Sequence, residues 1–432
     1  MSLADYKYEL ESCTRCSHCK FIPWPVMQSR RFSRGCPSAD NKKFHAYSAS
    51  GKIEIALSLL EGRLDNWTPE MQEVVYNCHM CGCCQMSCRP NNFLLCDHEE
   101  IFLELRMRAI ESGYILPEQM ILIDSLKQND NPFGQSREKR SDWSNGLDLI
   151  NLDDPTRQAD VIFHAGCRFS YHKQQWGTIR NAVQLIRESG KEVGIFKSTE
   201  SCCGGRAYEL GFKSVLKNFA EDTVSRIKSS KSQTLITACG DCYGTFKNLY
   251  LQASTPIDNI QIYHISEYLE KCLDAGTIQL KKKKKKRVTY HDPCHLGRKG
   301  EQVSPWNGEW KLTGSHIYEP VPEKPLKIGI NGCYDPPRNV IKAFPELEFV
   351  EMERIREYSW CCGSGAGVRE VFPEFAKWTA RERIEEAKSI DAEVIITACG
   401  WCQSILKETA DVNGESIEIV DITDLFFGGG GI

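Results

Sequence analysis

The sequence predicts an α+β multidomain chain, in which an all-α N-terminal module is followed by two tandem three-layer α/β repeats with parallel sheets. Three observations predict this fold class. The N-terminal part carries apolar side chains at spacings of three and four, which is the period of a helix packed on one face. Beyond it, short β-rich runs alternate with helical stretches, as is typical of parallel α/β structure. One set of cysteine motifs also occurs twice in the same order, which indicates an internal repeat.

Length and composition bound the function. The 432 residues are enough for two or three domains, and a formal net charge of −4 does not favour nucleic acid as a partner. The N-terminus lacks the apolar core of a signal peptide, and no apolar run approaches the roughly 18 residues that a membrane span needs. We therefore expect a cytoplasmic protein that contacts a membrane only through a partner. In that reducing compartment, 22 cysteines favour metal ligation over disulfides.

Two cysteine clusters in the N-terminal third follow the C-x2-C-x2-C…C spacing of [4Fe–4S] cubane ligands. They are Cys13, Cys16, Cys19 with Cys36, and Cys78, Cys81, Cys84 with Cys88. In two-cluster ferredoxins the fourth cysteine of each motif ligates the other cluster, so we pair Cys88 with the first triad and Cys36 with the second. The alternative is a pair of zinc sites, but zinc motifs usually group their cysteines in twos. The sequence therefore predicts two cubanes.

The segments between and after these motifs are predicted to be helical. Residues 50–62, 68–77 and 97–113 have helical apolar spacing, with Ser, Thr or Asp near their starts. We therefore expect a helical ferredoxin domain over residues 1–125. The next segment, residues 126–158, is polar, rich in turn residues and weakly periodic, so it is predicted to be a linker.

The rest of the chain repeats one unit. The matching landmarks are Cys167 and Cys294, Cys202/Cys203 and Cys361/Cys362, and Cys239/Cys242 and Cys399/Cys402. His164 and His291 each stand three residues before the first cysteine of their copy. The spacings differ mainly before the second adjacent pair, which predicts an insertion over residues 301–331, built as a surface loop or a small hairpin. We expect the first repeat over residues 159–280 and the second over residues 287–432.

Each copy places five cysteines at the C-terminal ends of three predicted strands, where α/β proteins build their sites. Strands are predicted at residues 160–165, 192–196, 234–238 and 260–264 in the first copy, and at 287–291, 347–352, 393–398 and 417–422 in the second. Five thiolates exceed the four that a tetrahedral zinc or a cubane takes, and adjacent cysteines can bridge two neighbouring irons. Gly204 and Gly363 follow the adjacent pairs. Lacking a side chain, they are expected to let the backbone approach a bulky inorganic core and to point N–H groups at its sulfurs.

Four cysteines lie outside these sets: Cys83, Cys96, Cys272 and Cys333. Cys272 and Cys96 are expected to be core residues. Cys83 lies inside a cluster loop, but the spacing favours Cys84 as the ligand. Cys333 is an alternative to Cys294 as the fifth ligand of the second copy, and we favour Cys294 because of its strand and its matched histidine.

A basic run from Lys281 to Arg287 carries seven positive charges. Such a run raises RNA or anionic lipid as partners. No aromatic residues interleave with it, however, so we predict a solvated segment between the two repeats.

The two CCG…ACGxC copies, with YHDPCHLGR opening the second, resemble the cysteine-rich domain of heterodisulfide reductases. The fusion to an N-terminal two-cluster ferredoxin is similar to the D-type polypeptide of these enzymes and its relatives, over nearly the whole chain. The resemblance implies that the cubanes relay electrons and that the CCG domain holds one or two non-cubane [4Fe–4S] clusters, which split a disulfide in single-electron steps. By motif match, the ligands of the first copy are Cys167, Cys202, Cys203, Cys239 and Cys242, and those of the second are Cys294, Cys361, Cys362, Cys399 and Cys402. The insertion departs from the family and leaves the substrate open, and zinc in one copy stays an alternative.

The sequence thus predicts an iron–sulfur oxidoreductase that works within a larger complex, with disulfide or thiol redox chemistry at the five cysteines of the second copy. His291, His295 and Arg298 are candidate proton donors or anion contacts, or else support the ligands. Arg206 is a candidate contact to an anionic substrate, or a structural ion-pair partner. The expected partners are other redox subunits, such as a flavoprotein, a ferredoxin or another iron–sulfur electron donor, and a small disulfide or thiol substrate. The alternative is a non-catalytic electron-transfer subunit whose active site lies on another chain, as in complexes that oxidise hydroxy acids or reduce benzoyl-CoA.

Overall fold

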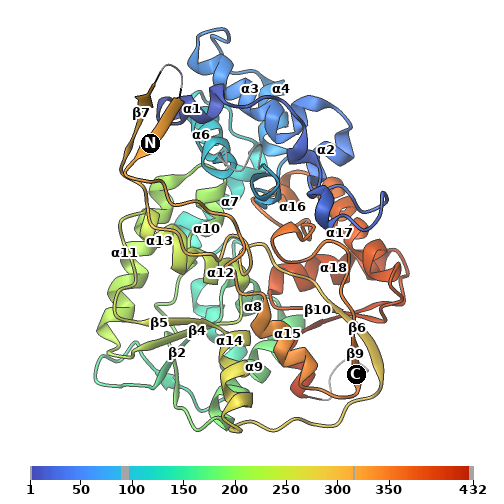
Figure 1. Cartoon of the computed structure of the whole chain (residues 1–432). Helices are drawn as coiled ribbons and strands as arrows, with labels where there is room; N and C mark the ends of the chain where they lie inside the picture. The colour runs from blue at the N-terminus through green and yellow to red at the C-terminus, as the bar shows by residue number, and fades with distance from the viewer. Residues whose placement is uncertain (1, 89–96, 315–316, 428–432) are drawn as a thin grey trace.

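The computed structural model describes residues 2–88, 97–314 and 317–427. Its N-terminal module is helical, as the sequence predicts, and forms the upper part of Figure 1. The helices described there are α1 (Lys7–Glu11), α2 (Pro37–Lys42), α3 (Ala49–Leu60), α4 (Pro69–Tyr76), α5 (Cys83–Met86), α6 (His98–Glu111) and α7 (Pro117–Asn129). Within the described part of this module, β pairing is limited to an isolated bridge between Phe21 and Arg34.

The helix starts in this module follow from capping residues. The side chain of Ser48 accepts a hydrogen bond from the backbone N–H of Gly51 at the start of α3, and Thr68 does the same for Met71 at the start of α4. α6 follows Asp97 and has acidic residues in its first turn, where the helix dipole favours negative charge. The three helices predicted from periodicity are therefore confirmed.

Two all-parallel sheets follow, with strand orders β1-β3-β2-β4-β5 and β11-β10-β6-β9. The first contains β1 (Ile150–Asn151), β2 (Val161–His164), β3 (Val193–Ile195), β4 (Thr234–Thr237) and β5 (Gln261–His264). The second contains β6 (Lys286–Tyr290), β9 (Leu347–Phe349), β10 (Val394–Thr397) and β11 (Glu418–Asp421). All eight predicted strands are confirmed, and β1 is an addition. Apart from β1, the two sheets have the same strand order, so the internal repeat extends to the topology.

Helices connect these strands. The first copy has α8 (Cys167–Tyr171), α9 (Trp176–Glu188), α10 (Gly205–Glu209), α11 (Lys213–Ser229), α12 (Gly240–Gly244), α13 (Tyr250–Gln252) and α14 (Ile265–Asp274). The second has α15 (Asp335–Lys342), α16 (Val368–Val371), α17 (Pro373–Lys388) and α18 (Gly400–Val412). Every residue of β2 and β10 is buried, which is the continuous burial typical of parallel strands. The three-layer arrangement of each copy stays a prediction.

The segment expected to be a linker, residues 126–158, is a packed part of the first copy. It contains the end of α7, a 3₁₀ stretch (Arg137–Ser144) and β1, which pairs with β3. Trp143 from this segment is buried against Phe163 of β2, with ring centroids 6.0 Å apart. Weak periodicity misled the sequence reasoning, because a 3₁₀ stretch buries single residues without a helical stripe.

The insertion in the second copy forms a hairpin of β7 (Glu309–Thr313) and β8 (Ile317–Val321), which confirms one of the two predicted forms. It lies against α1 at the top of the molecule (Figure 1). The ring of Tyr8 is 4.5 Å from that of Trp310, measured between centroids. Beyond the hairpin, Lys324 pairs with Glu9 and Asp97, each at 2.6 Å. The insertion therefore fastens the second copy to the helical module.

The basic run between the copies is solvated only in part. Lys282, Lys284 and Lys285 are exposed, as predicted. Lys283 is instead buried and donates a hydrogen bond of 2.8 Å to the carbonyl oxygen of Phe427. Among the helices that the structure describes, none combines the length and the apolar character that crossing a membrane requires.

Candidate metal centres

Four cysteines of the helical module line one small cavity. Cys36 stands directly before α2, Cys78 and Cys81 precede α5, and Cys84 lies in the first turn of α5. Burial raises the pKa of Cys36 and of Cys84, and the neighbouring sulfurs add to both shifts. The structure thus brings together the set predicted for the second cubane, including the fourth cysteine exchanged between motifs. Their role as ligands stays a prediction.

Cys83 points away from this cavity. Its sulfur lies 3.9 Å from the carbonyl oxygen of Tyr358 and packs with Cys81, Cys361 and Cys294. Cys84, by contrast, lines the cavity. The geometry therefore favours Cys84 over Cys83 as the cubane ligand, in line with the spacing argument.

Exchange of Cys84 for serine is expected to lower the iron content by about four per chain, since a cubane uses four thiolates. Cys83→Ala is the matched control one residue away and is expected to keep all the iron. The measurement is iron and acid-labile sulfide per chain after anaerobic purification, with the EPR signal of each centre. Equal losses from the two variants would contradict the assignment.

The first cysteine triad lies near the surface. Cys16 is exposed, Cys13 is half-buried and Cys19 is buried. Burial raises the pKa of Cys13, and the sulfurs of Cys19 and Cys16 add to the shift, so the three lie close together. The pairing of Cys88 with this triad stays a prediction.

The five predicted cysteines of the first copy form one buried group. Cys167 begins α8, Cys202 and Cys203 lie in the loop before α10, Cys239 caps α12 and Cys242 lies within it. Their thiols hydrogen-bond in series, from Cys167 to Cys202, then Cys203, Cys242 and Cys239. Five sulfurs from three strand ends therefore meet, as the motif spacing predicts.

The second copy repeats the arrangement. Thiol hydrogen bonds run from Cys361 to Cys362, then Cys402 and Cys399. Bonds with Cys361 and Cys402 lower the pKa of Cys362 to about 6. Cys294 is half-buried and packs against Cys361. The predicted five again form one group.

Sulfur contacts also join the separate groups. The thiol of Cys81, in the cubane cavity, hydrogen-bonds with Cys361 of the second copy. Cys399 of the second copy does the same with Cys239 of the first. The series therefore runs from the helical module through the second copy into the first.

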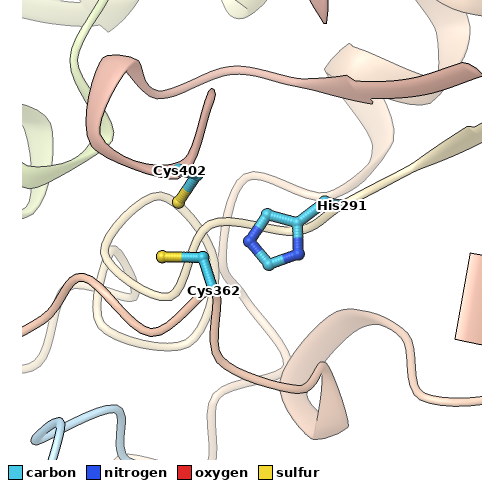
Figure 2. Close-up of side chains that lie close together, drawn as sticks. All are labelled: His291, Cys362 and Cys402. Carbon is cyan, nitrogen blue, oxygen red and sulfur yellow. The ribbon is translucent and has the colours of Figure 1, made fainter. Parts of the chain in front are cut away.

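His291 lies beside the second group. Figure 2 shows its ring next to Cys362 and Cys402, and one nitrogen of the ring and both sulfurs lie within 4.8 Å of one another. Arg383 Nε donates to His291 Nδ1 at 3.2 Å, while Nε2 has no partner among the described atoms. Burial, followed by the charge of Arg383, lowers the pKa of His291 to about 3. The ring is therefore neutral, which favours support of the sulfurs over proton donation.

His295 has the opposite character. Its Nε2 lies 2.8 Å from Glu209 Oε1, and its Nδ1 lies 3.3 Å from Asp241 Oδ1 and 3.4 Å from the sulfur of Cys294. Burial alone would lower the pKa of His295, but the charge of Glu209 raises it well above the usual value. A charged imidazole beside Cys294 fits the predicted role of proton donor. Both acids come from the first copy, and sequence reasoning missed them because no local motif links them to His295.

Arg298 and Arg206 are used in packing rather than aimed at a substrate. Arg298 Nη1 donates to the carbonyl oxygens of Glu357 at 2.9 Å and Ser359 at 2.8 Å. Arg206 Nη2 donates to the carbonyl oxygen of Ser364 at 2.9 Å, and its guanidinium lies 3.8 Å from the ring centroid of Trp401. The structure favours the structural alternative for Arg206, and it replaces the predicted proton or anion role of Arg298 with contacts to backbone.

The glycines after the adjacent cysteines do not face the sulfurs. A Cβ at Gly363 would lie 2.2 Å from the carbonyl oxygen of Ala376 in α17, and a Cβ at Gly204 would lie 3.1 Å from Phe219 Cβ in α11. The predicted reason, close approach to an inorganic core, is therefore wrong: what a side chain would meet is a helix. The predicted N–H contacts are present, because Gly204 donates to the sulfur of Cys202 and Gly363 to that of Cys361, each at 3.4 Å.

Gly363→Ala is expected to destabilise the protein by about 3 kcal/mol or more, since it combines a backbone clash with a φ of +100°. Gly204→Ala, at the matched position, also has a positive φ but meets only side-chain and helix atoms at 3.1 Å and beyond. Its cost is expected to be smaller, about 1–2 kcal/mol. Thermal unfolding of the two variants tests this order, and a larger loss in Gly204→Ala would refute it.

The remaining cysteines divide as follows. Cys272 is buried in α14, which confirms a core position. Cys333 is buried with its sulfur 3.8 Å from Ser266 Oγ, and it joins neither thiol series. This position favours Cys294 as the fifth member of the second group. Cys96 lies outside the described residues.

Two family models match the chain. One, described as a cysteine-rich domain (CCG), matches residues 161–247 and 328–407, and the other, described as a 4Fe–4S dicluster domain, matches residues 9–92. They confirm the duplicated α/β unit and the two-cluster N-terminal module. The second CCG match starts within the insertion, so it contains Cys333 and not Cys294. The place of Cys294 beside Cys361 comes from the structure alone.

Similar proteins share this combination. The D-type polypeptide of the dihydromethanophenazine:CoB–CoM heterodisulfide reductase of Methanosarcina acetivorans is 27% identical over 96% of this chain and 92% of its own length. The probable iron-sulfur-binding oxidoreductase FadF of Bacillus subtilis is 23% identical over 93% of this chain and 52% of its own length. The EtfAB:quinone oxidoreductase of Syntrophomonas wolfei is 23% identical over 97% and 58%. The chain therefore belongs to the family of iron–sulfur oxidoreductases that resemble the D-type polypeptide of heterodisulfide reductase, in which a dicluster ferredoxin module precedes two CCG domains.

Proposed function

We propose that this chain carries electrons from two [4Fe–4S] cubanes to one or two non-cubane [4Fe–4S] centres in the CCG copies, where a small disulfide or thiol conjugate is reduced. The observation that carries the proposal is the series of thiol contacts between the groups, at Cys81 with Cys361 and at Cys399 with Cys239. A relay needs neighbouring centres at short range, and these contacts supply it.

The residues present fit iron–sulfur clusters. Thiolates are the ligands that such clusters take, and each copy gathers five of them in a closed site. Buried donors without partners among the described atoms include His291 Nε2 and Arg140 Nη2, and cluster sulfides would accept from them. When bound, such clusters take up and release single electrons.

Metal analysis tests the cofactor part of the proposal. Four clusters predict about 16 irons per chain, whereas zinc in one copy predicts about 12 irons and one zinc. The ring of His291 with Cys362 and Cys402 within 4.8 Å is the set that would hold such a zinc. Colourless protein with iron only in the N-terminal module would overturn the proposal.

The protein supplies the electron entry and the proton. Cys16 is exposed, so electrons are proposed to enter at the first triad from a redox partner, such as a flavoprotein, a ferredoxin or another iron–sulfur protein. Reduction of a disulfide consumes two electrons and two protons and releases two thiols. His295, charged and 3.4 Å from the sulfur of Cys294, is proposed to provide a proton at the second copy. A cytoplasmic location remains part of the proposal.

A specific observation favours the second candidate, a non-catalytic electron-transfer subunit. Nine of the ten CCG cysteines are buried, and Cys294 alone of the ten is half-buried. Purified chain mixed anaerobically with a strong one-electron donor and a panel of disulfides separates the two. Turnover of a disulfide supports the enzyme. Full iron content, no turnover and tight association with other redox subunits would support the electron-transfer role.

A further inference from the structure

Arg140 is a buried arginine that donates to a proposed cluster ligand. It lies in the 3₁₀ stretch Arg137–Ser144, and its side chain is 2% exposed. Its Nη1 lies 3.4 Å from the sulfur of Cys167. Its Nε donates to Glu200 Oε1 at 2.8 Å, so the fork is held in one orientation. Its Nη2 is buried and has no partner among the described atoms.

The charges around Arg140 leave its guanidinium directed at the first copy. Glu200 is the carboxylate in contact with it, and the second oxygen of Glu200 lies 3.6 Å from His164 Nδ1. The ring of Tyr171 lies 5.9 Å from the guanidinium carbon. Arg140 therefore has one side fixed to an acid and one side on a sulfur, in a site closed to water.

The second copy has no equivalent contact at the matched cysteine within the described residues. Cys294 has the Nδ1 of His295 at 3.4 Å, a group already shared with two carboxylates. Arg298, the nearby arginine, donates to backbone carbonyl oxygens instead. Arg140 comes from outside the residues that the CCG model matches, so this difference is not part of the repeat.

We propose that Arg140 makes the centre of the first copy easier to reduce than that of the second, so that electrons collect in the first copy. The inference rests on the proposed function, namely that both copies hold iron–sulfur centres. A reduced centre carries one more negative charge, and a fixed cation hydrogen-bonded to a ligand sulfur stabilises that state. Hydrogen bonds to sulfur, net charge and burial are the means by which proteins set cluster potentials.

The order of the thiol contacts gives this asymmetry a direction. The cubane cavity touches the second copy through Cys81 and Cys361, and the second copy touches the first through Cys399 and Cys239. The first copy is thus the far end of the series and, with Arg140, its electron acceptor. Sequence motifs alone placed the chemistry in the second copy; the structure points to the first as the terminal centre.

The test is an EPR-monitored redox titration of the complete, cluster-loaded chain. Arg140→Gln is expected to lower the midpoint potential of the first-copy centre by at least a tenfold change in the ratio of reduced to oxidised form, about 59 mV for one electron. Glu200→Gln removes the compensating charge and is expected to raise the same midpoint. A purely structural role would move both variants in the same direction.

Two further variants complete the design. Arg180 donates to the carbonyl oxygens of Trp143 at 2.7 Å and Asn145 at 2.8 Å, and so holds the same segment without touching a cysteine. Arg180→Gln is expected to leave the midpoint unchanged. Arg140→Lys keeps the charge and is expected to shift the midpoint less than Arg140→Gln.

The outcomes are distinct. An unchanged midpoint in Arg140→Gln with full iron content overturns the inference and leaves the proposed function standing. A wild-type chain without iron in the CCG copies overturns the proposed function itself. If Arg140→Gln loses iron, Glu200→Gln decides: a raised midpoint supports the inference, and an unchanged or lowered one overturns it.

Discussion

Replacement of Arg106 by methionine is expected to lower the free energy of unfolding by about 4 kcal/mol and to loosen the contact between the helical module and both CCG copies. The guanidinium is buried in α6 and donates to the carbonyl oxygens of Cys78 at 2.7 Å, Glu209 at 2.6 Å and Ala366 at 3.3 Å. These acceptors belong to the module, the first copy and the second copy. Methionine would leave all three without this donor in a site closed to water, at about 1–3 kcal/mol for each unsatisfied group.

Arg108→Met is the matched control on the same helix. Arg108 is half-buried, and its loss is expected to change stability by no more than about 0.5 kcal/mol. A multidomain protein with bound clusters does not unfold in two states, so each transition is followed separately. Urea titration with tryptophan fluorescence and iron absorbance, together with limited proteolysis, measures the effect. Indistinguishable profiles for Arg106→Met and Arg108→Met would refute the joining role of Arg106.

Replacement of Cys399 by serine is expected to remove about four irons per chain and to lower disulfide reduction more than 100-fold, while the cubane EPR signals remain. The thiol of Cys399 hydrogen-bonds with both Cys402 and Cys239, so it joins its own group to the first copy. A serine hydroxyl is a harder ligand than a thiolate and does not suit iron–sulfur ligation. The variant therefore loses both a ligand and the contact between the copies.

Cys333→Ser is the control for this experiment. Cys333 is a buried cysteine of the same copy that joins neither thiol series. Its replacement is expected to keep the iron content and the activity. Iron loss in Cys333→Ser with retention in Cys399→Ser would reverse the choice between Cys333 and Cys294 and would require a different ligand set.

The parts of the fold that the sequence predicts are those that local patterns encode. The eight strands of the two repeats stand where β-rich runs precede the motif cysteines, and α3, α4 and α6 begin at Ser48, Thr68 and Asp97. The gathering of five cysteines in each copy follows from the rule that the carboxyl ends of parallel strands meet at one edge. The preference for Cys84 over Cys83 likewise followed from spacing, and the geometry favours it.

The features that sequence reasoning missed depend on contacts between distant segments. Arg140 lies in a segment without a helical or strand period, and only the folded chain places it on Cys167. The glycine rule failed at Gly363 because φ and the neighbour α17 are properties of the tertiary structure. His295 was identified from its motif, but its acids, Glu209 and Asp241, come from the other copy. Motif spacing describes one copy and says nothing about how the two copies face each other.

The hairpin insertion has a consequence for biosynthesis. Lys324 and Glu9 are 315 residues apart in the chain, yet they are joined in the finished protein. At translation rates of roughly 5–20 residues per second, about 15–60 s separate the emergence of the two side chains from the ribosome. The N-terminal domain therefore matures early but is locked only near the end of synthesis, which leaves an interval in which assembly factors can deliver iron to it before the strap closes.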